Sequence, residues 1–213
     1  LLKHELSRDS WTVYVAPFTA LIPPNNEYNV ATLLQPTDDE NTVFHFIAWS
    51  ETGGIGQEGV ANLKKFVEEG GALVFLNSAS DFAIEQFGLP VRDVTKGLPR
   101  KDFFIPGSIL RTEIDTTHPI AKGMPKESIA WFEDSPAFDV AQDARVEVIA
   151  RYPSDPKNVL LSGWALGAEK IAGKAVLVSI PMGKGKIVLF GFRPQYRAQS
   201  LATYPLLFNA ISQ

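Results

Sequence analysis

The sequence predicts an α/β fold in which a parallel sheet is flanked by helices. Apolar runs typical of buried strands alternate with amphipathic helical segments between Asn41 and Gly88, with short links between them. A chain of 213 residues, 45% hydrophobic and 21% charged, can build one large core. We therefore expect a single domain over 1–213, in which 1–40 form the least readable edge and 98–159 form an antiparallel β-rich insertion or an extension of the sheet.

The first strand–helix–strand unit carries the clearest signal. Val43–Trp49 is a nearly continuous apolar run, as expected for a strand covered on both faces. Gln57–Glu69 places apolar residues on one helical face, and Gly70–Gly71 is suited to a left-handed helix end. Ala72–Leu76 is the next apolar run. Such a unit predicts two parallel strands joined by a crossover helix.

The remaining elements are predicted from the positions of Gly, Pro and Ser and from the spacing of the apolar runs. Ser80 is expected to cap a short helix that Gly88 closes. The turn Gly183–Gly185 lies between two apolar runs and predicts a hairpin. Strands are expected at 108–114 and 146–152. A last helix has Pro205 in its first turn, and its apolar stripe is expected to contain Leu201, Tyr204, Phe208 and Ile211.

Composition excludes several classes of function. The net charge is −4 and no basic run occurs, so we expect no nucleic-acid partner. Cysteine is absent, which removes disulfides, thiolate metal ligands and a cysteine nucleophile. No apolar run approaches the roughly 18 residues that a membrane span needs. The three histidines (His4, His45 and His118) form no metal-binding motif, so we expect neither a metal nor a cofactor.

A glycine-rich turn, Gly54-Ile55-Gly56-Gln57-Glu58-Gly59, matches the short pattern of dinucleotide-binding turns. The glycines begin several residues after the strand, and Glu51 and Glu58 flank the place where a phosphate would lie. No acidic residue ends the next strand. A flexible turn before a helix accounts for the same residues, and a nucleotide-binding module is kept as an alternative.

Two polar turns are the other candidates for a site. The first follows a predicted strand and contains Ser78, which could act as a nucleophile although the glycines of a nucleophile elbow are missing. The second follows the last strand, where arginines could bind a carboxylate or pair with acids such as Asp81. Together they predict a degenerate ligand pocket of Asn77, Ser78, Ser80, Asp81, Arg193, Gln195 and Arg197.

Several blocks from Gly53 to Gln213 resemble the class I glutamine amidotransferase-like domain that is appended to bacterial zinc carboxypeptidases of the carboxypeptidase A type. The blocks are Gly53–Val60, Gly70–Val74, Ser80–Ile84, Pro106–Leu110, Leu161–Trp164 and Phe190–Gln195. The resemblance implies a flavodoxin-like parallel sheet. It does not extend to the first 40 residues, and Asn41–Trp49 fits it more loosely.

The resemblance also implies that the catalytic residues are lost. Active members have a cysteine at the elbow and a Phe-His-Pro-Glu motif after a late strand. Here the elbow is Asn77-Ser78-Ala79 and the late motif is Phe192-Arg193-Pro194-Gln195. Arginine cannot replace histidine in proton transfer near neutral pH. We therefore expect a non-catalytic accessory domain that binds a partner domain or a small ligand, and a hydrolase or transferase using Ser78 is the enzymatic alternative.

The resemblance further implies a partner and a compartment. The partner would be a neighbouring zinc peptidase domain of the same polypeptide, in a periplasmic or secreted protein. The aromatic residues Trp131, Phe132 and Phe138 in the β-rich insertion are the predicted docking surface, although the same residues could close the core.

Overall fold

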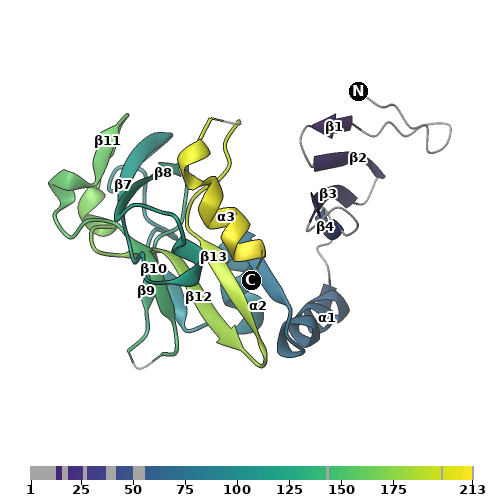
Figure 1. Cartoon of the computed structure of the whole chain (residues 1–213). Helices are drawn as coiled ribbons and strands as arrows, with labels where there is room; N and C mark the ends of the chain where they lie inside the picture. The colour runs from purple at the N-terminus through teal and green to yellow at the C-terminus, as the bar shows by residue number, and fades with distance from the viewer. Residues whose placement is uncertain are drawn as a thin grey trace. The chain divides into compact units, whose positions relative to one another are not determined.

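The computed structural model describes the strands at 13–15, 19–25, 28–36 and 42–49 and then residues 56–142, 144–197 and 199–212. The chain divides into two compact units, Leu1–Asn62 and Leu63–Gln213, where the sequence predicted one domain. Figure 1 shows the elements of both units. Each unit is described by itself.

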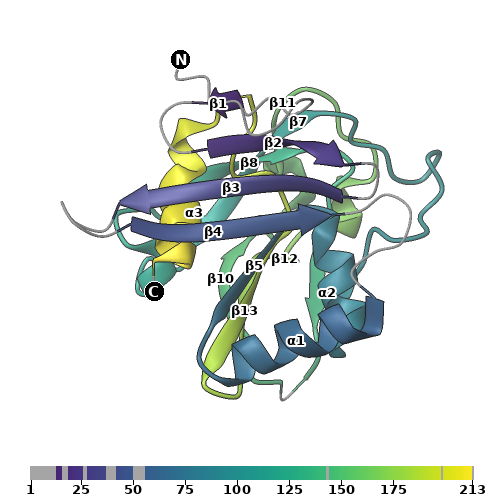
Figure 2. The same ribbon diagram turned by 90° about the vertical axis from the view of Figure 1, so that its right-hand side faces the viewer.

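The first unit contains an antiparallel four-stranded sheet (Figure 2). Its strands, in spatial order, are β1 (Val13–Val15), β2 (Thr19–Asn25), β3 (Tyr28–Pro36) and β4 (Thr42–Trp49). The prediction that the 43–49 strand belongs to a parallel sheet is wrong, because β4 pairs antiparallel with β3. The side chains of His45 and Trp49 lie outside the described residues.

Helix α1 (Gly56–Glu68) confirms the helix predicted after the glycine-rich turn. Gly70 follows it with a φ of 123°, a conformation that glycine adopts without strain, which agrees with the predicted helix end. Gly54 and Ile55 lie outside the described residues, so the glycine-rich turn is described only from Gly56 onward.

The second unit contains a nine-stranded mixed sheet. Its path runs β11-β7-β10-β12-β13-β5, with β8 paired to β7, β9 paired to β12, and β6 paired to β9. The strands are β5 (Ala72–Leu76), β6 (Val91–Asp93), β7 (Ser108–Ile114), β8 (Glu127–Phe132), β9 (Phe138–Val140), β10 (Glu147–Arg151), β11 (Leu160–Ser162), β12 (Ala175–Met182) and β13 (Gly185–Phe190).

The parallel flavodoxin-like sheet is therefore a wrong prediction, while the α/β class is confirmed. Among the described strands of this sheet, only β5 and β13 pair in parallel, and the other ladders are antiparallel. The physical reason lies in 98–159, whose strands are joined without crossover helices and so pair antiparallel. These strands are part of the nine-stranded sheet, which agrees with the second of the two alternatives, an extension of the sheet.

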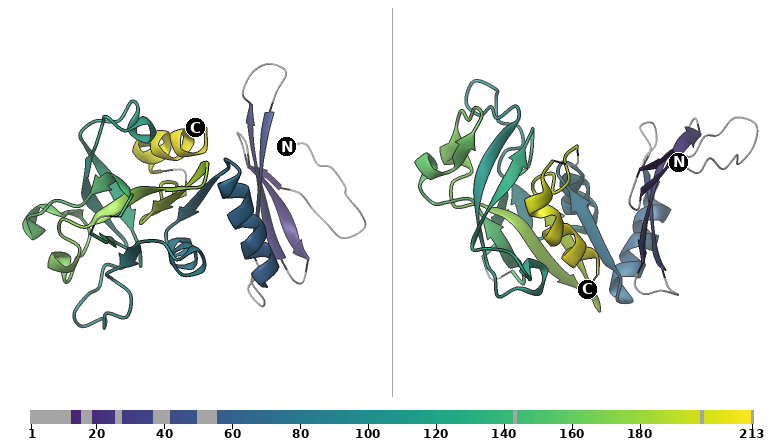
Figure 3. Two further views of the ribbon diagram at one scale, coloured as in Figure 1. Left: turned by 90° about the horizontal axis from the view of Figure 1, so that it is seen from below. Right: turned by 45° about the horizontal axis from the view of Figure 1, so that its top comes forward.

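Helices cover both faces of this sheet. Along β13, Val188 and Phe190 pack into one core cluster with Leu206 of α3 (Tyr204–Ile211). Ile187 and Leu189 point into the opposite cluster, with Phe87 of α2 (Ala79–Phe87). This alternation is the two-residue period of a strand buried on both faces. Figure 3 shows α2 and α3 on opposite sides of the sheet. Four short 3₁₀ helices complete the described part: η1 (Pro119–Ala121), η2 (Pro156–Asn158), η3 (Ala168–Lys170) and η4 (Leu201–Thr203).

Local sequence signals predicted the turns better than the last helix. Gly88 ends α2 in the left-handed conformation (φ 61°), and β12 and β13 form the predicted hairpin. The stripe predicted for the last helix is wrong, since Leu201 and Phe208 are 65% and 44% exposed. The residues of α3 that enter the core are Leu206 and Ala210.

Candidate functional site

The candidate site lies at the sheet edge where β5, β8 and β13 end. β5 and β13 run in parallel. The pairing through β12, β10 and β7 gives β8 that same direction, because each of the four successive ladders is antiparallel. The segments that follow these three strands therefore emerge at one edge, which is where open α/β sheets bind their ligands.

Asn77 occupies the sharp turn between β5 and α2. Its φ is 53°, its side chain is buried, and its backbone N–H donates to the Phe190 carbonyl at 2.8 Å. The Asn77 Oδ1 atom has no hydrogen-bond partner among the described residues. A strained strand-to-helix turn of this kind presents the nucleophile in elbow enzymes. An amide at this position cannot act as one.

The two serines after Asn77 differ in their surroundings. Ser78 is exposed and sits at the start of α2 without a side-chain cap bond. Ser80 was predicted to cap the helix, and this is wrong: it is fully buried and its hydroxyl donates to the Phe190 carbonyl at 3.3 Å. Ser80 therefore joins the α2 turn to the end of β13, and Ser78 remains in solvent.

Arg193 was expected to pair with an acid such as Asp81, but it pairs with Glu133. The Arg193 Nη1 atom lies 2.7 Å from the Glu133 Oε2 atom, just beyond the end of β8. Asp81 instead faces Lys96, with 3.8 Å between Oδ2 and Nζ. Glu133, the partner of Arg193, is distant from it in sequence. It follows β8, a strand of the β-rich segment that ends at this edge.

The other predicted residues after β13 surround an aromatic stack. The Tyr196 ring lies 4.6 Å from the Trp131 ring at an interplanar angle of 19°. The guanidinium groups of Arg193 and Arg197 lie 5.8 Å and 5.2 Å from the Tyr196 ring centre, within cation–π range. Arg197 has a φ of 49°, and Gln195 is exposed. Ligand binding by the predicted set stays a prediction.

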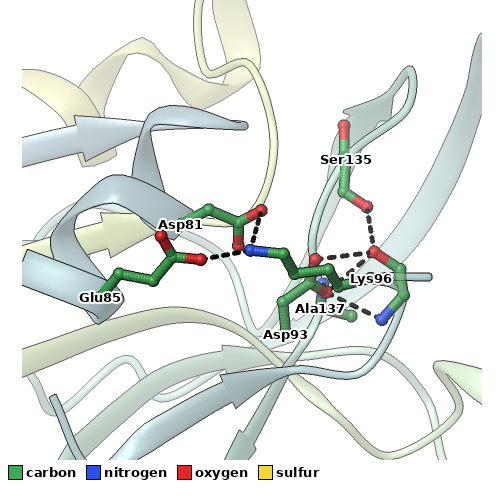
Figure 4. Close-up of polar contacts among 7 residues, drawn as sticks. Asp81, Glu85, Asp93, Lys96, Ser135 and Ala137 are labelled. Carbon is green, nitrogen blue, oxygen red and sulfur yellow. Dashed lines mark hydrogen bonds and ion pairs between the residues drawn. The ribbon is translucent and has the colours of Figure 1, made fainter. Parts of the chain in front are cut away.

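Asp81 belongs to a charged network that ties α2 to the following loop (Figure 4). Lys96 lies between the carboxylates of Asp81 and Glu85. Asp93 accepts hydrogen bonds from Thr95 and from the Ala137 N–H. Burial raises the pKa of the Asp81 carboxyl, the Asp93 carboxylate adds to the rise, and Lys96 opposes it. These contacts satisfy each other within the fold and have a structural role.

A cavity of about 430 Å³ lies beside this network, where the loop after β6 meets the turn after β8. Sequence reasoning missed it. It shares no residue with the predicted pocket, and it is lined by Thr95, Leu98, Arg100, Phe103, Phe104, Ile105, Phe132, Asp134 and Ser135. The one available signal was the pair of phenylalanines, Phe103 and Phe104, shortly after Arg100 in a segment rich in Gly and Pro.

Two kinds of site are not found in the part of the chain that the structure describes. No group of three or more His, Asp or Glu residues there is arranged to hold a metal ion. Among the described helices, none has the length and apolar character required to cross a lipid bilayer.

His118 caps η1 by accepting the Ile120 N–H at 3.1 Å, and its other ring nitrogen lies 3.2 Å from Glu147.

Comparison with known proteins gives two sequence matches, each over part of the chain. Residues 4–70 match the family model described as LigXa C-terminal domain like. The phthalate 4,5-dioxygenase oxygenase subunit of Pseudomonas putida is 66% identical over 38 residues, which are 18% of this chain and 9% of that protein. The chain thus shares less than a tenth of the length of this relative.

Solved structures give fold-level likenesses at low identity. A GMP synthase-type protein of Thermoplasma acidophilum is 12% identical, with a TM-score of 0.44 over 72% of this chain and 63% of that one. A ThuA-like protein of Parabacteroides merdae is 13% identical, with a TM-score of 0.45 over 76% and 66%. Both TM-scores are below 0.5, so these likenesses establish neither a shared function nor a shared site.

Proposed function

We propose that Leu63–Gln213 is a non-catalytic accessory domain related to class I glutamine amidotransferases. The observation that carries the proposal is the elbow between β5 and α2, where a buried asparagine takes the strained position (φ 53°) that a nucleophile needs. Arg193 supports it, because this residue stands where the resembled enzymes have their catalytic histidine and is neutralised by Glu133. A guanidinium stays protonated and cannot relay a proton.

The resemblance to carboxypeptidase-associated domains supports a finer proposal. In it, the domain positions or stabilises a neighbouring zinc peptidase domain, and the larger protein is periplasmic or secreted. The enzymatic alternative, a hydrolase or transferase using Ser78, would need a general base within hydrogen-bond reach of the hydroxyl. No such contact to the Ser78 hydroxyl occurs among the described residues.

For residues 4–70 we propose a structural relationship to domains of the LigXa C-terminal type. The support is the family match, and 38 residues of this chain are in addition 66% identical to an oxygenase subunit. Oxygenase activity is not part of this proposal, since the shared segment is a small fraction of that enzyme.

Absence of glutamine hydrolysis is the first expected result. Purified protein incubated with glutamine should release ammonia no faster than the buffer, because neither a thiolate nor a histidine base is available at the elbow. A Ser78→Ala variant should behave identically. Ammonia release above background that disappears in the Ser78→Ala variant would overturn the non-catalytic proposal.

The accessory role predicts an effect on a neighbouring domain. The parent polypeptide should be expressed with and without Leu63–Gln213, and its peptidase domain should melt at a lower temperature without this region. Contacts made only in the folded state shift the folding equilibrium toward that state. The measurements are the melting temperature and kcat/KM on a peptide substrate. Identical values, with the two parts tumbling independently in solution, would contradict the role.

A further inference from the structure

The cavity between the loop after β6 and the turn after β8 combines an apolar floor with a charged rim. The accessible apolar side chains of its lining are Leu98, Phe103 and Phe104, which are half-buried, while Phe132 and Ile105 are 0% and 1% exposed. Arg100 and Asp134, the charged residues of its lining, are exposed. Its volume of about 430 Å³ falls within the roughly 300–1,000 Å³ typical of small-molecule sites.

The polar groups of the lining fall into two classes. Thr95 and Ser135 are already satisfied: the Thr95 hydroxyl donates to Asp93 at 2.8 Å, and the Ser135 hydroxyl bonds both the N–H and the carbonyl of Glu133. Arg100 and Asp134 are different. Within the described residues, neither takes part in an ion pair. They are also too far apart to pair with each other, so one cation and one anion face the same cavity unneutralised.

The Arg100 side chain and the backbone of Asp134 are positioned before any ligand arrives. The Arg100 guanidinium lies 4.4 Å from the centre of the Phe104 ring, which leaves its N–H groups free. Asp134 has a φ of 45°, in a turn that the buried Ser135 hydroxyl closes and that Asp93 anchors through the Ala137 N–H at 3.1 Å. A rigid rim lowers the entropic cost of binding. A left-handed aspartate outside a glycine turn is also the kind of strained residue that gathers at ligand sites.

We propose that this cavity binds a free α-amino acid with a large apolar side chain. The carboxylate of the ligand would meet Arg100, its ammonium group would meet Asp134, and its side chain would lie on Leu98 and Phe103. Guanidinium and carboxylate match in geometry, and charge-assisted hydrogen bonds are the stronger ones. The proposal goes beyond the accessory role, because it needs neither the elbow turn nor a partner domain.

The test uses the full chain and three probes of one shape: L-phenylalanine, 3-phenylpropionate, which lacks the ammonium group, and 2-phenylethylamine, which lacks the carboxylate. Isothermal titration calorimetry should give saturable binding of phenylalanine, and each of the other two should bind at least about tenfold more weakly, as expected for loss of one charge-assisted contact. Absence of saturable phenylalanine binding would overturn the proposal. So would equal affinity for 3-phenylpropionate, which would indicate a site for anions.

Two variants assign the contacts. Arg100→Gln should bind phenylalanine no better than 2-phenylethylamine, and Asp134→Asn should bind it no better than 3-phenylpropionate. Asparagine tolerates the left-handed conformation, so Asp134→Asn removes the charge and leaves the turn intact. Matched controls are Lys126→Gln and Glu113→Gln, two exposed charges outside the lining. Equal losses in the controls would contradict the assignment. The probe comparison on the unaltered chain stands even if a variant does not fold, and its outcome is independent of the glutamine assay.

Discussion

Phe132→Ala should lower the free energy of unfolding of the second unit by about 3–5 kcal/mol, as large-to-small changes at fully buried aromatic positions do. The Phe132 ring is 0% exposed in the core cluster that α3 covers. It lies 5.9 Å from the Phe103 ring and 6.3 Å from the Tyr152 ring. Removing it leaves a cavity beneath two aromatic neighbours. Urea denaturation monitored by circular dichroism would measure the loss.

The control for this prediction is Trp164→Ala. Trp164 is 64% exposed, and surface substitutions usually stay within about 0.5 kcal/mol. The comparison also decides between the two interpretations of the β-rich segment, docking surface or core. A Phe132→Ala variant that melts like the unaltered protein would mean that this ring is available to a partner, against its burial in the structure.

The sequence was sufficient where the signal is local. Gly88 ends α2 because a left-handed residue is needed there, and the two apolar runs around Gly183 can only pair as a hairpin over so short a turn. The resemblance implied a parallel sheet, and the parallel pair that the second unit does contain, β5 with β13, brings the Asn77 turn and Phe190 together. Each of these features depends on residues close in sequence or on a fold-level resemblance.

The sequence was insufficient where partners are distant. The strand at 42–49 has the composition of a buried parallel strand, but composition does not specify a partner, and it pairs with β3. Arg193 finds Glu133, 60 residues earlier, only because β8 ends at the same edge as β13. The cavity likewise depends on Arg100 and Asp134 facing one space from two loops. Hydrophobic periodicity does not predict which side chains that are distant in sequence lie close together in the fold.

Tyr152→Phe should raise the free energy of unfolding by about 1–3 kcal/mol, the cost of a buried polar group without a partner. Tyr152 is 0% exposed, and its hydroxyl has no hydrogen-bond partner among the described residues. Phenylalanine keeps the ring, and therefore its packing against Phe132. The variant removes only the unsatisfied oxygen, so the gain should appear as a higher denaturation midpoint with an unchanged slope.

The pH dependence gives this variant a second and independent readout. Burial raises the pKa of the Tyr152 hydroxyl well above its ordinary value of about 10. Above pH 10 the unfolded chain releases this proton while the folded chain retains it, so the unaltered protein loses stability as the pH rises. Phenylalanine has no such proton, and its advantage should therefore grow from pH 9 to pH 11. A Tyr152→Phe variant that is less stable than the unaltered protein would show that the hydroxyl is hydrogen-bonded in solution, and a difference that stays constant across this pH range would show that the hydroxyl is not buried.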